Sequence, residues 1–335
     1  IRDRFYKRDG WYWILCPAGG VAGGWQLAMR SKSPYGPYEW KRVLERGKTT
    51  MNGPHQGGWI HTKYGEDWFI HFQDKGPYGR VCHLQPVDWS SGWPVMGNAG
   101  EPYWKFRKPK SDSKTIVNPV ETDEFDSSKL GMQWQWQNDY KESYGQATSM
   151  GFFRLFTYAL PELGDVSNLW YVPNMLLQKT PADEFTATTK LSFCSRNSDQ
   201  YVGLVCMSAE YSSVGLQRTE DGYELQIRHN PNAMRTHLTD EVLTVDTLKP
   251  TQKGTPRKGR PAEMHIKDVY LRMSIKDSKV NYAYSIDGKK WKKAGGEYAM
   301  GKGRWIGSKI GFFAVDPNKT GRKGFIDIDW FRISR

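Results

Sequence analysis

The sequence predicts an all-β protein with two regions: repeated four-strand units of the β-propeller kind in residues 1–110 and a two-sheet β-sandwich in residues 121–335. Three observations lead to this prediction. Aromatic residues make up 14% of the 335 residues and 34 residues are glycine, a composition typical of β-proteins. A four-strand pattern occurs twice near the start of the chain, and short alternating segments separated by turn residues fill the second region. A chain of this length can form two hydrophobic cores.

The repeat consists of a polar turn followed by an aromatic strand. The first copy reads Lys7-Arg8-Asp9-Gly10-Trp11-Tyr12-Trp13-Ile14 and the second reads Tyr64-Gly65-Glu66-Asp67-Trp68-Phe69-Ile70, with a period of 57 residues when Trp11 is aligned with Trp68. Each copy continues through a glycine-rich loop into another strand, at residues 24–30 and 79–85. Propellers close with about four to eight such blades. We therefore expect residues 1–110 to be the last blades of a propeller whose first blades the chain as given lacks.

A linker is predicted at residues 111–120, where Ser111, Ser113 and Pro119 interrupt the pattern. Asp221-Gly222 and Asp287-Gly288 stand where hairpin turns of the sandwich would lie, and no amphipathic helix is predicted. The expected strands of the sandwich cover residues 132–137, 152–159, 175–178, 185–193, 201–209, 214–218, 223–229, 269–275, 279–286, 309–315 and 325–333.

Composition and charge argue against two classes of partner. No stretch approaches the roughly 20 apolar residues that a membrane span requires. The net charge is +12, but the basic residues fall in short loop clusters at 105–110, 253–260, 289–293 and 319–323, without a nucleic-acid-binding motif. We interpret them as a solvated surface, with attraction to an acidic polysaccharide as the alternative.

The cysteines and histidines show no metal-ligand spacing. Cys16, Cys82, Cys194 and Cys206 contain no Cys-x-x-Cys pair, so a zinc site is not expected. A symmetric hairpin around residues 196–199 would place Cys194 opposite Tyr201 rather than Cys206, so we predict buried free thiols and leave the redox compartment open. The histidines without ligand spacing are His61, His71, His83, His229, His237 and His265.

One set of motifs resembles a known family. The elements Gly53-Pro54-His55-Gln56-Gly57-Gly58-Trp59, Phe72-Gln73-Asp74-Lys75-Gly76 and Tyr78-Gly79-Arg80-Val81 resemble glycoside hydrolase family forty-three. The branch it resembles contains β-xylosidases and α-L-arabinofuranosidases with a C-terminal concanavalin-like β-sandwich. The sandwich is similar as well, in Tyr284-Ser285-Ile286-Asp287-Gly288-Lys289-Lys290-Trp291 and Asp327-Ile328-Asp329-Trp330-Phe331.

The resemblance implies a five-bladed propeller and an inverting hydrolysis of xylosides or arabinosides of hemicellulose, in a secreted or periplasmic protein. Inversion needs an acid and a base about 6.5–9.5 Å apart. The family's acid, a Glu before Gly-Pro, aligns with Ile1, and Arg2-Asp3 replace Gly-Pro. The base and a third carboxylate belong to the absent blades, so no catalytic carboxylate is carried over and the chain alone is expected to be inactive.

The carboxylates that are present do not replace the missing ones. Asp9, Glu66 and Asp67 lie at predicted hairpin tips, where water would keep their pKa values ordinary. Asp74 follows an aromatic strand, but no partner stands at a predictable distance from it.

Five residues of the first region are candidates for binding. By resemblance, His55 faces a calcium ion at the propeller centre, directly or through water, with a core histidine as the alternative. Arg80 is expected to reach the sugar, or else to form a surface ion pair. Gln56 and Gln73 would bind sugar hydroxyls or serve in turns and ladders, and Trp25 would stack on a pyranose or fill the core.

The sandwich holds two further candidate groups. Glu124, Asp327 and Asp329 would hold a structural calcium ion where the first and last strands meet, or are ordinary strand-edge carboxylates. Aromatic residues that would form a sugar platform, or fill the core, are Trp134, Trp136, Trp170 and Tyr171.

Three hypotheses of function follow. The first is a hemicellulose glycosidase acting on xylo- or arabino-oligosaccharides. The second is a non-catalytic carbohydrate-binding protein in which residues 120–335 bind xylo-oligosaccharide and even the complete gene product turns nothing over. In the third, the sandwich only buttresses the propeller, so that its deletion impairs folding without removing a sugar contact.

Overall fold

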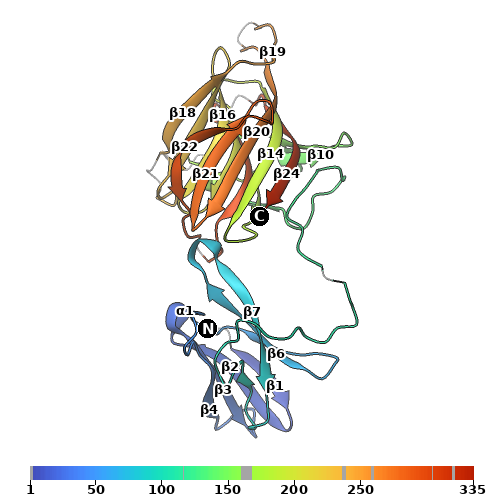
Figure 1. Cartoon of the computed structure of the whole chain (residues 1–335), viewed down its shortest axis with the longest axis vertical. Helices are drawn as coiled ribbons and strands as arrows, with labels where there is room; N and C mark the ends of the chain where they lie inside the picture. Colours follow the sequence, from blue (N-terminus) through green and yellow to red (C-terminus); the bar gives the residue numbers. More distant parts are fainter. Residues whose placement is uncertain are drawn as a thin grey trace. The chain divides into compact units, whose positions relative to one another are not determined.

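In the computed structural model, almost all of the regular secondary structure is β-strand (Figure 1). It divides between Val117 and Asn118 into two compact units, called here the N-terminal unit and the C-terminal unit. Among the described residues, no helix has the length and apolar composition of a membrane span. The structure describes residues 3–115, 117–159, 168–235, 239–257, 260–303, 305–318 and 321–335. Ile1, the aligned position of the general acid, and His237 lie outside these ranges.

The N-terminal unit contains two four-stranded antiparallel sheets. The first is formed in order by β1 (Arg4–Arg8), β2 (Trp11–Ala18), β3 (Trp25–Ser31) and β4 (Glu39–Leu44). The second is formed in order by β5 (Gly58–His61), β6 (Asp67–Asp74), β7 (Arg80–Asp88) and β8 (Val95–Met96). The predicted repeat is confirmed, since β2 and β6 hold the same place in the two sheets. The number of blades in a complete propeller stays a prediction.

The two sheets of this unit share an aromatic core. The ring of Trp13 on β2 packs edge-on against those of Trp89 and Trp93, with centroids 5.1 and 5.7 Å apart. The Arg30 guanidinium lies 4.2 Å from the centroid of Trp93. Alternate residues of each strand point into this core because side chains alternate across a strand. The buried members are Trp13, Leu15, Ala28, Val43, Leu44, Phe69 and Met96.

The C-terminal unit contains two eight-stranded sheets. The first sheet runs β10 (Gly145–Ala147), β11 (Phe153–Phe156), β24 (Phe325–Ser334), β14 (Phe185–Ser195), β20 (Met264–Lys276), β21 (Lys279–Ser285) and β22 (Lys292–Ala299), with β19 (Gln252–Lys253) paired to β20. The second runs β18 (Glu241–Leu248), β17 (Tyr223–Asn230), β16 (Tyr211–Arg218), β15 (Tyr201–Met207), β23 (Lys309–Asp316), β13 (Leu176–Lys179) and β9 (Gln135–Trp136), with β12 (Tyr158–Ala159) paired to β23.

These two sheets lie face to face within the unit (Figure 1), which confirms the predicted sandwich. Phe312 on β23 and Phe331 on β24 are fully buried, and their ring centroids are 5.5 Å apart across the interface. The Tyr282 hydroxyl on β21 donates a hydrogen bond to the Ser212 carbonyl on β16, at 2.7 Å. The interface between the sheets is therefore both apolar and hydrogen-bonded.

Within the part of the chain that the structure describes, helical structure is confined to short turns. The only α-helical segment among the described residues is α1 (Gly20–Gly23), four residues long. The 3-10 helices of the described residues are η1 (Gly76–Tyr78), η2 (Glu142–Tyr144) and η3 (Leu169–Tyr171).

Four strands of the sandwich were not predicted: the short strands β10 and β19 and the longer strands β18 and β22. Both β18 and β22 lie at the end of a sheet, and most of their residues are half-buried or exposed. An edge strand with few buried positions carries little apolar alternation, which is the signal that sequence reading uses. The predicted hairpins at Asp221-Gly222 and Asp287-Gly288 are confirmed, since they join β16 to β17 and β21 to β22.

The predicted hairpin between the strands carrying Cys194 and Cys206 is wrong. β14 belongs to one sheet and β15 to the other, so Cys194 lies opposite His265 and Phe325 instead of Tyr201. Turn residues mark where the chain reverses, but they do not show which sheet the next strand joins. All four cysteines are free. Cys82 is exposed and Cys16 is half-buried, so burial is confirmed only for Cys194 and Cys206.

Candidate functional site

His55 is a buried imidazole in the loop between β4 and β5, with 1% of the residue exposed. A methyl group added to Gly24 would come within 2.4 Å of this ring and 2.2 Å of the Gly20 carbonyl oxygen. Gly53, two residues before His55, has a φ of 49°, and an added methyl group there would lie 1.9 Å from the Val21 carbonyl oxygen. The glycines allow the α1 turn to close against the imidazole, a role that sequence reasoning did not assign to them.

The pKa of the His55 imidazole is lowered, which favours its neutral form, and the ring is incompletely hydrogen-bonded. Burial is the main cause that lowers its pKa, and the Arg80 guanidinium adds to this, while backbone hydrogen bonds at Gly53 and Gly20 oppose it. Its Nδ1 atom has no hydrogen-bond partner among the described residues. Such a buried nitrogen calls for a water, an ion or a ligand. Because calcium prefers oxygen ligands, the imidazole fits a calcium ion through an intervening water, and the ion itself stays a prediction.

Arg80 and His55 both pack near the phenyl ring of Phe72. Arg80 begins β7, directly after η1 and Gly79, and it faces Asp74 across the β6–β7 pair. Its guanidinium carbon lies 4.5 Å from the Phe72 ring centroid, and that centroid lies 6.1 Å from the centroid of His55. Arg80 is half-buried and forms no ion pair within the part of the chain that the structure describes. The structure thus brings together the two residues that the motifs singled out, and it adds Phe72, which sequence reasoning missed.

The other three candidates, Gln56, Gln73 and Trp25, differ in how many contacts their side chains make within the protein. Gln56 has a φ of 57°, is half-buried, and its amide has no partner among the described residues, so it is free to bind a ligand. Gln73 donates to the Thr50 carbonyl at 3.1 Å and accepts from His83 at 3.2 Å. These bonds favour a structural role for Gln73, and sugar binding by it stays a prediction.

Trp25 is also engaged by its own unit. The Arg42 guanidinium lies 4.3 Å from its ring centroid, and a methyl group added to Gly19 would come within 2.3 Å of the ring. These contacts favour the packing alternative over stacking on a pyranose, which stays a prediction.

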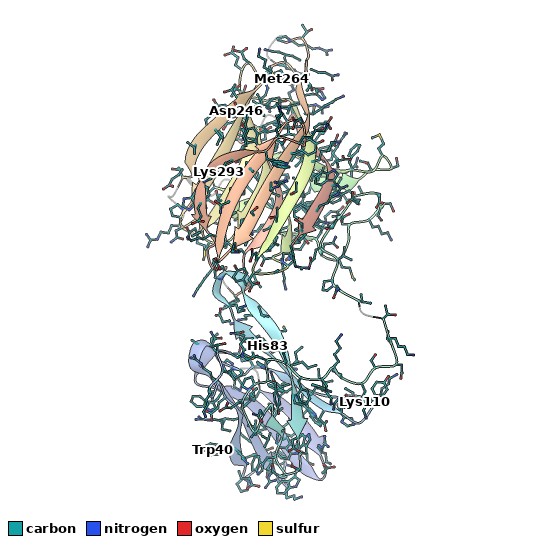
Figure 2. The ribbon with its side chains drawn as sticks, viewed as in Figure 1. Trp40, His83, Lys110, Asp246, Met264 and Lys293 are labelled. Atoms are coloured by element: carbon teal, nitrogen blue, oxygen red, sulfur yellow. The ribbon has the colours of Figure 1, made fainter. Side chains whose placement is uncertain are left out.

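A histidine pair lies next to this site. His71 on β6 and His83 on β7 face each other in register, with ring centroids 5.5 Å apart, and Figure 2 marks His83 on its strand. Burial lowers the pKa of His71 to about 4. Its Nδ1 atom donates to the Phe72 carbonyl at 3.3 Å, and its Nε2 atom has no partner among the described residues. The pair depends on cross-strand register, so spacing along the chain did not reveal it.

The expectation that Glu66 and Asp67 sit in water with ordinary pKa values is wrong, because their side chains are only 8% and 9% exposed. The Lys110 backbone N–H, donating at 2.8 Å, is the main cause that lowers the pKa of Glu66, and Arg107 adds an ion pair. Burial alone would raise the pKa of Asp67. Hydrogen bonds outweigh this and lower it; they come from His61, Trp59 and Arg8. Both carboxylates are therefore held in structural contacts.

Asp9 and Asp74 do not supply a catalytic pair either. Asp9 is exposed and pairs with Arg8 at 3.1 Å. Asp74 accepts a hydrogen bond from the Gly76 N–H at 3.0 Å, which shapes the turn before β7.

The predicted calcium ligands of the C-terminal unit do not converge. Each carboxylate pairs with a different cation: Glu124 with Arg332 at 2.8 Å, Asp327 with Arg154 at 2.7 Å and Asp329 with Lys190 at 2.9 Å. Among the described residues, the three do not form a cluster with donor atoms close enough to share one ion. The structure favours the strand-edge alternative.

The proposed sugar platform of the sandwich is largely core. Trp134 is buried, its ring centroid lies 5.6 Å from that of Phe125, and its indole N–H donates to Asp123 at 2.7 Å. Trp170 packs against the buried cluster around Leu169. Trp136 packs on Tyr140, Tyr144 and Phe153, so these aromatic rings do not present one flat surface.

One cluster was not apparent from the spacing of the cysteines and histidines along the chain. Cys194, Glu263 and His265 bring a sulfur, an oxygen and a nitrogen atom within 4.8 Å of one another. Cys194 and His265 are 71 positions apart and meet only because β14 pairs with β20 in that register. Burial raises the pKa of the Cys194 thiol to about 12, so the free thiol is not an activated nucleophile.

Comparison with known proteins gives a consistent result for both units. Residues 122–334 match the family described as beta xylosidase C-terminal concanavalin A-like domain, and residues 3–94 match glycosyl hydrolases family 43. A putative beta-xylosidase of Xylanibacter ruminicola is 33% identical over 315 residues, which cover 92% of this chain and 54% of the relative. A non-reducing end alpha-L-arabinofuranosidase of Bacteroides ovatus is 25% identical over 84% of this chain and 51% of its own length.

A solved structure shows the same fold. The xylan beta-1,4-xylosidase from Bacillus halodurans superposes with a TM-score of 0.81 at 20% identity, over 99% of this chain and 64% of that protein. The chain spans about half the length of the curated relatives that it matches.

Proposed function

The chain belongs to glycosyl hydrolase family 43. On this premise we propose that it is part of an inverting hemicellulose glycosidase, either a β-xylosidase or an α-L-arabinofuranosidase. The chain would contribute Arg80 and His55 to the site of that enzyme. The observation that carries the proposal is the group of Arg80, Phe72 and His55. It combines a half-buried guanidinium that has no ion pair among the described residues with a buried, incompletely bonded imidazole.

Arg80 has the chemistry that a sugar-binding pocket requires. Its guanidinium carries five N–H donors in a planar fork, which can bond hydroxyl oxygens and lower the pKa of a nearby carboxyl group. Phe72 packs against the guanidinium and restricts its position. Gln56, whose amide is uncommitted among the described residues, would add a donor and an acceptor for hydroxyl groups.

We assign the catalytic acid and base to residues outside these 335. In the described N-terminal unit, Glu66 and Asp67 are buried in ion pairs and hydrogen bonds, and Asp74 holds a turn. Glu66 and Asp67 each have a lowered pKa and three partners, so they are poor proton donors at neutral pH.

His55 would take part indirectly. A bound calcium ion would supply a fixed positive charge that orders water at the site. The neutral imidazole of His55, with its free Nδ1, would hold one of these waters in place. This role of calcium and the secreted or periplasmic location come from the family resemblance, and both are part of the proposal.

The complete gene product, assayed on chromogenic β-xyloside and α-L-arabinofuranoside, tests the proposal. We expect turnover of one or both, and Arg80→Ala should lower kcat/KM about 10- to 100-fold because hydrogen bonds to a charged group are lost. Arg332→Ala removes an exposed guanidinium of the C-terminal unit, paired with Glu124, and is the matched control that should leave kcat/KM unchanged.

Two results would contradict the proposal. The first is equal kcat/KM for the wild type and Arg80→Ala on every substrate that is cleaved. The second is binding of xylo-oligosaccharide without any turnover by the complete protein, which would establish the non-catalytic carbohydrate-binding alternative.

A further inference from the structure

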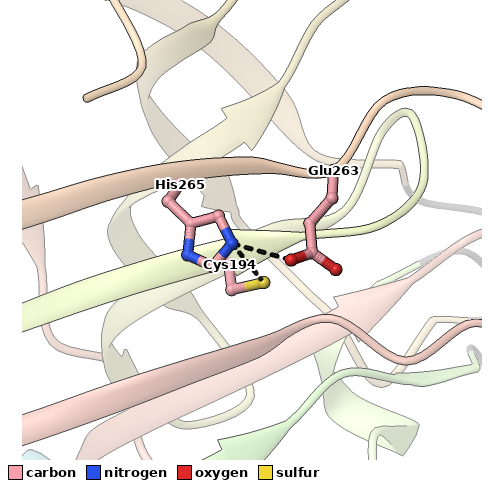
Figure 3. Close-up of side chains that lie close together, drawn as sticks. All are labelled: Cys194, Glu263 and His265. Atoms are coloured by element: carbon pink, nitrogen blue, oxygen red, sulfur yellow. Dashed lines mark hydrogen bonds and ion pairs between the residues drawn. The ribbon is translucent and has the colours of Figure 1, made fainter. Parts of the chain in front are cut away.

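Three different donor atoms meet at the end of two paired strands in the C-terminal unit. Cys194 is the penultimate residue of β14, His265 is the second residue of β20, and Glu263 directly precedes β20. The His265 Nε2 atom lies 3.4 Å from the Cys194 Sγ atom and 2.8 Å from the Glu263 Oε1 atom. Figure 3 shows that both contacts converge on the same ring nitrogen.

This geometry differs from that of a nucleophilic triad. In such a triad one imidazole nitrogen faces the nucleophile and the other faces the carboxylate, so that a proton can be taken on one side while the other side orients the ring. Here a single nitrogen faces both groups, and no relay through the ring is possible. Without an ion, the Nε2–H of His265 donates to Glu263 Oε1, and the Cys194 thiol can donate to the same carboxylate.

We propose that Cys194, Glu263 and His265 bind a zinc-type divalent transition-metal ion, with water completing its coordination. Thiolate, imidazole and carboxylate are the three side-chain ligands that zinc uses, whereas calcium and magnesium take oxygen ligands and disfavour sulfur. Ligand atoms at the usual bond lengths from one zinc ion lie roughly 3 to 4 Å from each other. The observed separations of 2.8 and 3.4 Å need only small side-chain adjustments to meet this requirement.

A second layer of contacts holds the ligands in place. The Arg196 Nε atom donates to the other carboxylate oxygen of Glu263 at 2.7 Å, which leaves Oε1 directed at the cluster. Hydrogen-bonded carboxylate ligands of this kind are usual around protein metal sites because the outer partner fixes the ligand's orientation. The nearby Arg154 is neutralised by two hydrogen bonds to Asp327, so it adds little net repulsion toward a cation.

The cluster is closed on one side and open on the other. Cys194 is buried, whereas the side chains of His265 and Glu263 are 31% and 39% exposed. Cys194 and His265 also line a hollow of about 220 Å³ together with Phe325 and Asp268. This hollow provides the entry path and the space for water that a three-ligand site requires. A bound ion would tie β14 to β20 independently of any sugar chemistry.

The test uses the full 335-residue chain, purified without a histidine tag and stripped of metal with a chelator. Titration with Co²⁺ should produce, at about one equivalent, a thiolate-to-cobalt charge-transfer band that Zn²⁺ then removes. Cys194→Ser should abolish the band, and Glu263→Gln and His265→Gln should weaken Zn²⁺ binding about tenfold or more. Cys206→Ser replaces the other buried thiol, on β15 in the opposite sheet, and should retain both the band and the affinity.

Thermal unfolding separates loss of the site from loss of the fold. Zn²⁺ should raise the Tm of the wild type and of Cys206→Ser but not that of Cys194→Ser, with all three folded by circular dichroism before metal is added. Absence of the charge-transfer band in the wild type, or equal Zn²⁺ affinity for the wild type and Cys194→Ser, would overturn the proposal. The cluster would then be a hydrogen-bonded group alone. None of these readouts depends on glycosidase activity, so they test the metal site separately from the proposed function.

Discussion

The two units differ in how completely they satisfy their buried polar atoms. Among the described residues, five buried side-chain atoms without a hydrogen-bond partner belong to the N-terminal unit, residues 1–117, and three belong to the C-terminal unit, residues 118–335. The smaller unit therefore holds more of them. The atoms are Trp13 Nε1, Gln26 Oε1, His55 Nδ1, His71 Nε2 and Trp89 Nε1 in the first, and Asn174 Oδ1, Arg218 Nε and Arg218 Nη1 in the second.

The difference reflects how each unit places its polar groups. In the C-terminal unit, paired strands bring donors and acceptors together, as with Arg154 and Asp327 on β11 and β24. In the N-terminal unit, a loop and glycine turns enclose His55, and its Nδ1 atom has no hydrogen-bond partner among the described residues. Buried polar atoms without partners are rare in native proteins and often mark ligand, ion or water sites. The comparison thus favours the N-terminal unit as the place for a bound ligand, ion or water, and three measurements test how the two units differ.

The largest expected effect is in the sandwich core. Phe331→Ala removes a fully buried ring that packs against Trp134 and Phe312, and it should lower the free energy of unfolding of the C-terminal unit by about 3–5 kcal/mol. Urea unfolding followed by circular dichroism measures the change. Ile286→Ala, at a position 62% exposed, should change it by no more than about 0.5 kcal/mol. Similar losses for the two variants would show that the sheets are not held by this core.

The second effect is a pH dependence of the N-terminal unit. The pKa of His71 is about 4 in the folded protein, against 6.5 as its ordinary value, so between these two pH values the unfolded chain binds more protons. The contribution of His71 to stability is therefore full above pH 6.5 and is lost as the pH falls toward 4, by at most about 1.4 kcal/mol per pH unit. His83, whose pKa burial also lowers, adds to the same slope.

His71→Leu should flatten that slope, because it replaces a buried imidazole that resists protonation with an apolar side chain. Unfolding by urea at several pH values between 6.5 and 4, followed by tryptophan fluorescence, gives the measurement. His229→Leu, in the C-terminal unit, is the control and should leave the slope of the N-terminal unit as it is. An unchanged slope in His71→Leu would mean that His71 is not buried as a neutral group.

The smallest effect concerns the surface carboxylates of the sandwich. Glu124 and Arg332 have side chains 46% and 52% exposed, so Glu124→Gln should lower the free energy of unfolding by less than about 1 kcal/mol. Added Ca²⁺ should change the Tm of the wild type and Glu124→Gln equally, since Glu124, Asp327 and Asp329 have separate cationic partners. A calcium-dependent rise of Tm in the wild type alone would restore Glu124 as a calcium ligand.

Much of the fold and part of the site could be read from the sequence, because the signals involved are local. Alternating side chains and Asp-Gly turns predicted most strands of the sandwich, and the aromatic repeat predicted two equivalent sheets. The motif around His55 and the motif Tyr78-Gly79-Arg80-Val81 identified two residues that pack against one phenyl ring in the structure. These features depend on neighbours a few positions away, so they survive without knowledge of the rest of the fold.

What only the tertiary structure decided depends on which strands pair and in which register. That pairing carries Cys194 into the sheet of His265 and away from Tyr201. The return of the chain near Lys110 buries Glu66, which spacing alone placed in water. Hydrogen bonds between strands are non-local and nearly uniform along the backbone, so composition and periodicity do not specify the partner strand. Only the packing of the whole unit selects it, and with it the groups that meet.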